Sequence, residues 1–139
     1  MGGYIRIVLK KYIHPFPSKP QHYPHSHWEI SYGAIQQLVP DDDTSPAINI
    51  SRIRCVQGIV GALLYYGRAV DNTLLVALNV IVTQQSKATE ATAVTIRQVL
   101  DYVDTYPNDS VTYRASGMRP ASLSDDAYLN VYKAHRLAG

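Results

Sequence analysis

The sequence has little charge and a single cysteine. Only 17% of its residues are charged, and the 13 Lys and Arg against 11 Asp and Glu give a net charge of +2. So small an excess does not by itself indicate a nucleic-acid-binding protein. Cys55 alone excludes an internal disulfide and fits a reducing compartment. Because it lies within a helical pattern, we expect a small buried apolar residue rather than a nucleophile.

Long apolar runs are also missing. The longest, residues 74–82, is broken by Asn79 and is much shorter than the ~20 residues of a membrane-spanning helix. The first five residues have no apolar core typical of a signal peptide. With 46% hydrophobic residues in a chain of 139, we expect a soluble domain with a modest core, neither secreted nor bound to a membrane.

Two consecutive helices are predicted in the centre of the chain. Apolar residues recur at spacings of three and four over residues 52–70 and again over 74–82, and the residues between them, 71–73, are of types that cap helices. Gly58 and Gly61 each cost about 1 kcal/mol in a helix interior. We therefore expect a second backbone to approach closely at these two positions.

Two further helices flank this pair. A short amphipathic helix is predicted over residues 3–13, ended by Pro15 and Pro17, and another follows Thr89 and ends before Pro107. Short connections favour an antiparallel helix layer. The apolar faces predicted for the two helices comprise Tyr4, Ile5, Val8, Leu9 and Tyr12 in the first, and Ala93, Ile96, Leu100 and Val103 in the second.

A strand is predicted after the last helix. Residues 110–115 alternate in polarity, with Val111 and Tyr113 on one side and Thr112 and Arg114 on the other. The predicted fold is mainly α with a small terminal β hairpin, an α+β protein. The alternation predicts the first strand of the hairpin, and a resemblance to a known family implies the second.

Residues 14–50 form a connector rich in proline and histidine. Its histidines allow two interpretations, a zinc site or a proline-braced loop in which histidine and Trp28 pack over the helices. No standard zinc spacing is present. The run of Asp at 41–43 similarly allows magnesium binding or a solvated loop between prolines. The histidines of the possible zinc site are His14, His22, His25 and His27.

The order of several motifs resembles one family. Residues 57–66, Gln-Gly-Ile-Val-Gly-Ala-Leu-Leu-Tyr-Tyr, and 68–71, Arg-Ala-Val-Asp, are similar to the segment that follows the reverse transcriptase palm in Pol polyproteins of Ty1/copia-like LTR retrotransposons. The Tyr-x-Asp-Asp hairpin of the palm is absent from the sequence. The resemblance continues in order through Gly3-Tyr4-Ile5, His14-Pro15, Tyr32-Gly33, the 41–46 loop and Leu100-Asp101-Tyr102.

The resemblance implies a domain plan and a metal ligand. Residues 1–13 would be the helix after the palm, 14–50 a connector, 51–108 a three-helix connection region and 109–139 the truncated start of an RNase H-like domain. Asp125 matches the first of the four carboxylates that bind Mg²⁺ in the intact family protein. The fragment alone is expected to hold no cofactor, since the two-metal chemistry requires several carboxylates. Pro120 departs from the pattern, where an apolar strand residue is expected.

The resulting hypothesis is a fragment of a reverse transcriptase/RNase H polyprotein that supports the primer–template, with RNA–DNA hybrid or DNA as partner and no complete catalytic site. Its location would be intracellular, in cytoplasmic virus-like particles or the nucleus. The alternative is a small helical interaction module without enzymatic role. Exposed apolar faces would favour self-association and poor solubility. The residues expected to contact phosphates, unless they serve only solubility, are Arg6, Lys10, Lys11, Arg52 and Arg54.

Overall fold

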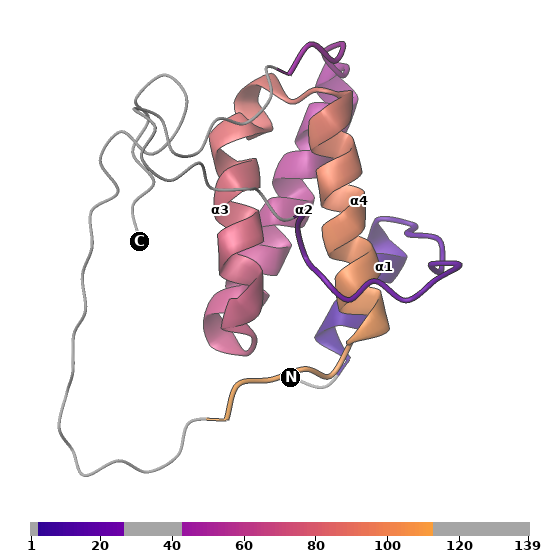
Figure 1. Cartoon of the computed structure of the whole chain (residues 1–139), viewed down its shortest axis with the longest axis vertical. Helices are drawn as coiled ribbons and strands as arrows, with labels where there is room; N and C mark the ends of the chain where they lie inside the picture. Colours follow the sequence, from indigo (N-terminus) through magenta and orange to yellow (C-terminus); the bar gives the residue numbers. More distant parts are fainter. Residues whose placement is uncertain (1–2, 27–42, 113–139) are drawn as a thin grey trace, which may run out of the picture. The chain divides into compact units, whose positions relative to one another are not determined.

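The computed structural model describes residues 3–26 and 43–112, and helices take up 64% of them (Figure 1). Each helix that the apolar spacing predicts is present. Two short 3₁₀ turns, Asn72–Leu74 and Gln85–Lys87, precede the third and fourth helices. The four helices are α1 (Tyr4–Lys11), α2 (Ile50–Ala69), α3 (Leu75–Gln84) and α4 (Glu90–Thr105).

The predicted β hairpin is not found, and the α+β class is wrong for the described part of the chain, which contains no strand or sheet. The first residues of the predicted strand, 110–112, have no regular structure. Instead of joining a neighbouring strand, the backbone N–H of Val111 donates to the carbonyl of Val70, just past the end of α2 (3.0 Å). The rest of the expected hairpin, with Asp125 and the RNase H-like strands, lies in residues 113–139, outside the described ranges.

Polar side chains mark where the helices begin. Asn49 Oδ1 accepts a hydrogen bond from a backbone N–H in the first turn of α2 (2.8 Å). Asp71 Oδ1 accepts one from the backbone N–H of Thr73 (3.1 Å) at the turn before α3. Thr89 and Thr92 form a reciprocal capping box at the start of α4. Each cap satisfies backbone donors that a helix leaves unpaired at its first turn.

The core lies between α2, α3 and α4, with α1 packed against α4 and α2. The segment before α2 is tied to the start of α4, since Ile48 N–H donates to the carbonyl of Ala88 (3.1 Å) and Glu90 N–H to that of Pro46 (3.0 Å). α2 and α4 therefore start side by side. α3 runs in the opposite direction, from the end of α2 back toward the start of α4 (Figure 1). None of the described helices combines the length and apolarity needed to cross a membrane. The side chains with no exposed surface are Leu63, Leu74, Ala77, Leu78, Ile81 and Ala88.

The sequence predicts that a second backbone approaches Gly58 and Gly61 of α2. This prediction is wrong for both positions. At Gly58 the neighbour is a side chain: a Cβ placed there would lie 2.5 Å from the Oη of Tyr12, just past the end of α1. At Gly61 a Cβ would meet no atom of residues 3–26 and 43–112 within 4 Å. Cys55 is also exposed rather than buried. Both predictions fail for the same reason. Cys55, Gly58 and Gly61 lie on the side of α2 away from the apolar stripe that enters the core.

Candidate nucleic-acid interface

Helix α1 is a short platform fixed to α2. Its inner face enters the core, where Ile5 is only 1% exposed. The Oη of Tyr4 donates a hydrogen bond to the carbonyl of Ala62 (3.2 Å), and its ring stacks on Tyr66 with 5.9 Å between centroids. A helix of eight residues is too short to be stable alone in water, so these contacts determine its position.

Three cations lie on the exposed side of this platform. Arg6, Lys10 and Lys11 are exposed, and none forms an ion pair within residues 3–26 and 43–112. Lys11 Nζ lies 5.3 Å from the ring centroid of Tyr12, within cation–π range. The two lysines in the last turn also complement the helix dipole, which is a sufficient structural reason for their presence. The structure therefore brings together three of the five cations predicted to contact phosphates.

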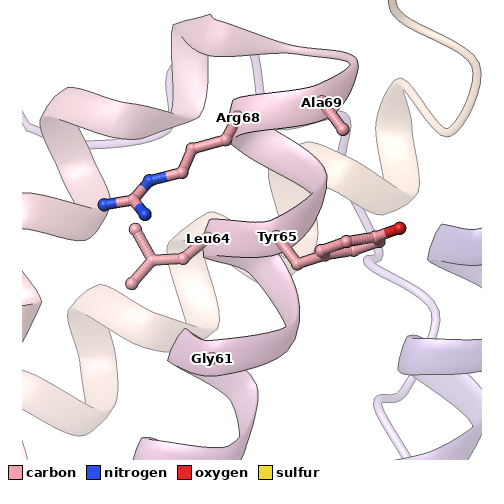
Figure 2. A pocket seen from close by; sticks show the side chains of 5 residues that line it. All are labelled: Gly61, Leu64, Tyr65, Arg68 and Ala69. Carbon is pink, nitrogen blue, oxygen red and sulfur yellow. The ribbon is translucent and has the colours of Figure 1, made fainter.

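The outer face of α2 has a shallow depression. Its volume is about 400 Å³, and its lining is mostly apolar (Figure 2). Gly61 lies at one end of the lining, the side chains of Leu64 and Arg68 lie on one side of the helix, and Tyr65 and Ala69 lie on the other. Sequence reasoning missed this site. The spacing of 61, 64, 65 and 68, which defines one face of a helix, was the signal available.

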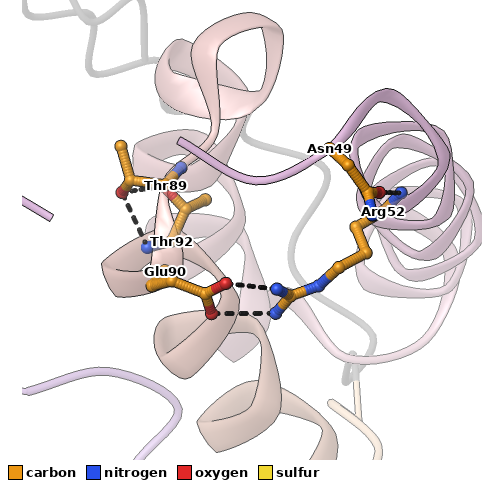
Figure 3. A network of polar contacts seen from close by, with 5 residues as sticks. All are labelled: Asn49, Arg52, Thr89, Glu90 and Thr92. Atoms are coloured by element: carbon orange, nitrogen blue, oxygen red, sulfur yellow. Dashed lines mark hydrogen bonds and ion pairs between the residues drawn. The ribbon is translucent and has the colours of Figure 1, made fainter. Parts of the chain in front are cut away.

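Arg52, the fourth predicted cation, is engaged by a carboxylate (Figure 3). Its guanidinium donates to both carboxylate oxygens of Glu90, with 2.9 Å between Nη2 and Oε2. The hydrogen bond from Arg52 lowers the pKa of Glu90, and the same bond raises the pKa of Arg52. Arg54, the fifth, is exposed on α2 and forms no ion pair with a described residue. A phosphate would have to compete with Glu90 for Arg52, so α1 is the stronger part of the candidate interface.

One histidine of the connector, His14, contacts α4, and another, His22, contacts Tyr106 just past its end. His14 Nε2 lies 2.8 Å from Asp101 Oδ1, and the His14 side chain is 4% exposed. His22 Nδ1 lies 2.6 Å from the Oη of Tyr106. His25 is described and His27 lies outside the described ranges. The interpretation of a loop whose histidines pack over the helices is confirmed for His14.

No metal site is formed by the residues described. Within residues 3–26 and 43–112, no three His, Cys, Asp or Glu side chains lie together in a way that would hold a metal ion. In the acidic loop, Asp43 accepts a hydrogen bond from the backbone of Ser45 (2.9 Å) and one from Thr89, and bonds from these two residues lower its pKa. The Mg²⁺ ligand implied by the resemblance, Asp125, lies outside the described ranges, as do Asp41 and Asp42.

Comparisons with family models, with curated proteins and with solved structures find no match to the chain.

Proposed function

We propose that this chain is a non-catalytic part of a Ty1/copia-like Pol polyprotein, the thumb and connection after the reverse transcriptase palm, and that α1 contacts the phosphates of the primer–template. The order of motifs along the sequence supports the assignment to this family. The three exposed cations on a fixed α1 support the contact with phosphates. No polymerase or nuclease activity is expected from the chain alone.

The arrangement on α1 suits a phosphate backbone. Arg6 and Lys10 are four residues apart and so lie on the same side of the helix, about 6 Å apart along its axis, with Lys11 beside them. Contacts to phosphate depend on positive charge and fix the position of a duplex without reading its sequence. Because Ile5 and Tyr4 hold the helix in the core, the cations are presented from a rigid base.

The salt dependence of binding tests this proposal. The dissociation constant of the full chain for a short RNA–DNA hybrid is measured by fluorescence anisotropy over a range of KCl concentrations. Each phosphate contact contributes about 0.7 to 0.9 to the slope of log K against log salt. The triple variant Arg6→Gln/Lys10→Gln/Lys11→Gln should therefore lower the magnitude of the slope by roughly 2 to 3.

A matched control separates position from net charge. The variant Lys19→Gln/Lys87→Gln/Arg97→Gln removes the same charge from three exposed residues elsewhere in the described chain. It should keep the wild-type slope. If both triple variants reduce the slope equally, or if the folded wild type does not bind the hybrid, α1 is not a phosphate-contacting surface.

The alternative, a helical interaction module, is favoured by a different observation. Large apolar side chains lie exposed on and just after α1: Ile7 is 67% exposed, Ile13 88% and Phe16 85%. Such residues are costly to leave in water and are common in protein interfaces. A stable oligomer that is indifferent to the hybrid, measured by light scattering after size-exclusion chromatography, would support this second function over the first.

A further inference from the structure

The exposed face of α2 carries a heptad pattern that the nucleic-acid proposal does not use. Arg54, Gly61 and Arg68 are spaced by seven residues, so they lie almost in line along the helix, with about 10 Å between successive positions. Leu64 and Tyr65 lie between Gly61 and Arg68 on the same face. The face therefore has a mostly apolar depression with Arg68 at one end of its lining, and Arg54 lies one heptad before Gly61, at the other end.

The depression has the shape of a hole for one side chain. Gly61, Leu64, Tyr65 and Arg68 occupy positions i, i+3, i+4 and i+7, the four positions that form a hole for a knob in coiled-coil packing. A cavity of about 150 Å³ can hold a benzene ring, so about 400 Å³ of open depression accommodates a large apolar side chain. Among the described residues, no atom lies within 4 Å of the Cβ position at Gly61, which leaves this end of the depression open to an approaching helix.

The charges on this face select the partner. α2 contains three arginines and no acidic residue. Arg52 is paired with Glu90, whereas Arg54 and Arg68 form no ion pair within residues 3–26 and 43–112. A second copy of α2 packed on this face would bring like charges together, which is unfavourable. The apolar middle does not suit a phosphate backbone, which needs cations along its whole length.

We propose that this face of α2 binds an amphipathic helix that inserts one large apolar side chain into the depression between Gly61 and Arg68 and places carboxylates against Arg54 and Arg68. The inserted side chain fills the depression between Leu64 and Tyr65. The two ion pairs, one on each side of it along α2, fix the register of the bound helix. This site uses residues other than those of α1 and does not depend on the proposed contact with nucleic acid.

A pair of designed peptides tests the proposal on the full chain. Each is a fluorescently labelled helical peptide of about three heptads with Leu in the middle. One has Glu seven residues before and after the Leu, and the other has Lys at both positions. By anisotropy, the wild type should bind the Glu peptide at least about tenfold more tightly than the Lys peptide. The variant Arg54→Glu/Arg68→Glu should prefer the Lys peptide instead.

Two further variants complete the test. Gly61→Leu fills the depression and should weaken binding of the Glu peptide about tenfold, while its circular dichroism spectrum stays that of the wild type because the added side chain points to open space. Lys19→Glu/Arg97→Glu makes the same charge change as the double arginine variant at other exposed positions. This control should keep the wild-type preference.

Four outcomes would overturn the proposal. The first is equal binding of the two peptides, or no binding, by the folded wild type. The second is a reversed preference in the Lys19 and Arg97 control. The third is a concentration-dependent dimer that Gly61→Leu abolishes, which would assign the face to a second copy of the chain. The fourth is displacement of the peptide by an RNA–DNA hybrid with loss of hybrid binding in Arg54→Glu/Arg68→Glu, which would assign it to nucleic acid.

Discussion

Two of the three glycines of α2, Gly58 and Gly61, should respond differently to the same substitution. Gly61→Ala adds a methyl group that meets no atom of the described residues within 4 Å, so the variant gains only helix propensity. Removing glycine from a helix interior in favour of alanine stabilises by roughly 0.5 to 1 kcal/mol. The free energy of unfolding of Gly61→Ala should rise by about that amount.

Gly58→Ala has the same propensity gain but meets an obstacle. The new Cβ would lie 2.5 Å from Tyr12 Oη, much closer than the ordinary separation of about 3.5 to 4 Å between nonbonded heavy atoms. Tyr12 must therefore turn away, and an off-rotamer side chain costs of order 0.5 to 1.5 kcal/mol. The costs and the gain largely cancel, so Gly58→Ala should be neutral or destabilising.

Tyr12→Phe supplies the control for this argument. It removes Oη and leaves Cζ as the nearest atom, 3.4 Å from the Cβ position at Gly58. In the Tyr12→Phe background, Gly58→Ala should therefore recover a stabilisation close to that of Gly61→Ala. The measurement is urea unfolding followed by circular dichroism, with the midpoints compared at unchanged m-value. Equal stabilisation by both glycine substitutions in the wild-type background would show that Tyr12 does not lie against Gly58.

Three further substitutions test polar contacts through the urea midpoint. Arg52 lowers the pKa of Glu90, so the pair contributes its full stabilisation of the fold above the ordinary pKa of a Glu side chain, about 4.3. This contribution is lost as pH falls through the lowered pKa. Arg52→Gln should remove this acid dependence. Tyr66→Phe removes the hydrogen bond from Tyr66 Oη to the carbonyl of Asp109 (2.9 Å) and should cost about 1 kcal/mol. Because burial raises the pKa of Tyr66, its contribution is complete below about pH 10 and lost as pH rises through the raised pKa, a loss that Tyr66→Phe should abolish. Thr89→Ala removes the N-cap of α4 and should cost about 1 kcal/mol.

Controls for these substitutions lie on α4. Arg97→Gln removes an exposed charge that forms no ion pair with a described residue, so it should leave the acid dependence of Glu90 in place. Thr95→Ala removes a hydroxyl that bonds only to the carbonyl of Ala91 in the preceding turn (3.1 Å), and it should be near neutral. A cost for Thr95→Ala equal to that for Thr89→Ala would contradict a specific capping role.

The helices could be predicted from the sequence because their signals are local. The apolar residues of α4 recur at spacings of three and four, and Thr89 and Pro107 stand just outside its two ends. The same local signals gave α1 and the pair formed by α2 and α3. The strand was predicted on weaker grounds, because the alternation at residues 110–115 is short. In the structure, the backbone N–H of Val111 donates to the carbonyl of Val70 instead of to a neighbouring strand.

The site could be predicted only in part, because its geometry depends on residues far apart in the sequence. The cations of α1 were found from their type and spacing. The pairing of Arg52 with Glu90, 38 residues away, has no local signal. Nor does the contact of His14 with Asp101 across 87 residues. The open face at Gly61 was missed for a related reason, since an apolar pattern shows that a helix is buried on one side but not what covers its flanks.

The long-range contacts that hold α1 in place affect the order in which the chain folds during synthesis. Tyr4 bonds to a carbonyl 58 residues further along, and His14 to a carboxylate 87 residues further along. Translation delivers α1 before the other three described helices, yet this eight-residue helix has no lasting partner until α2 and then α4 have left the ribosome. Pulse-labelled hydrogen exchange during refolding should accordingly show protection in α2 before α1. Of the four described helices, α1 is made first and is fixed in place last, and its cations take their final positions only when the other three helices have packed.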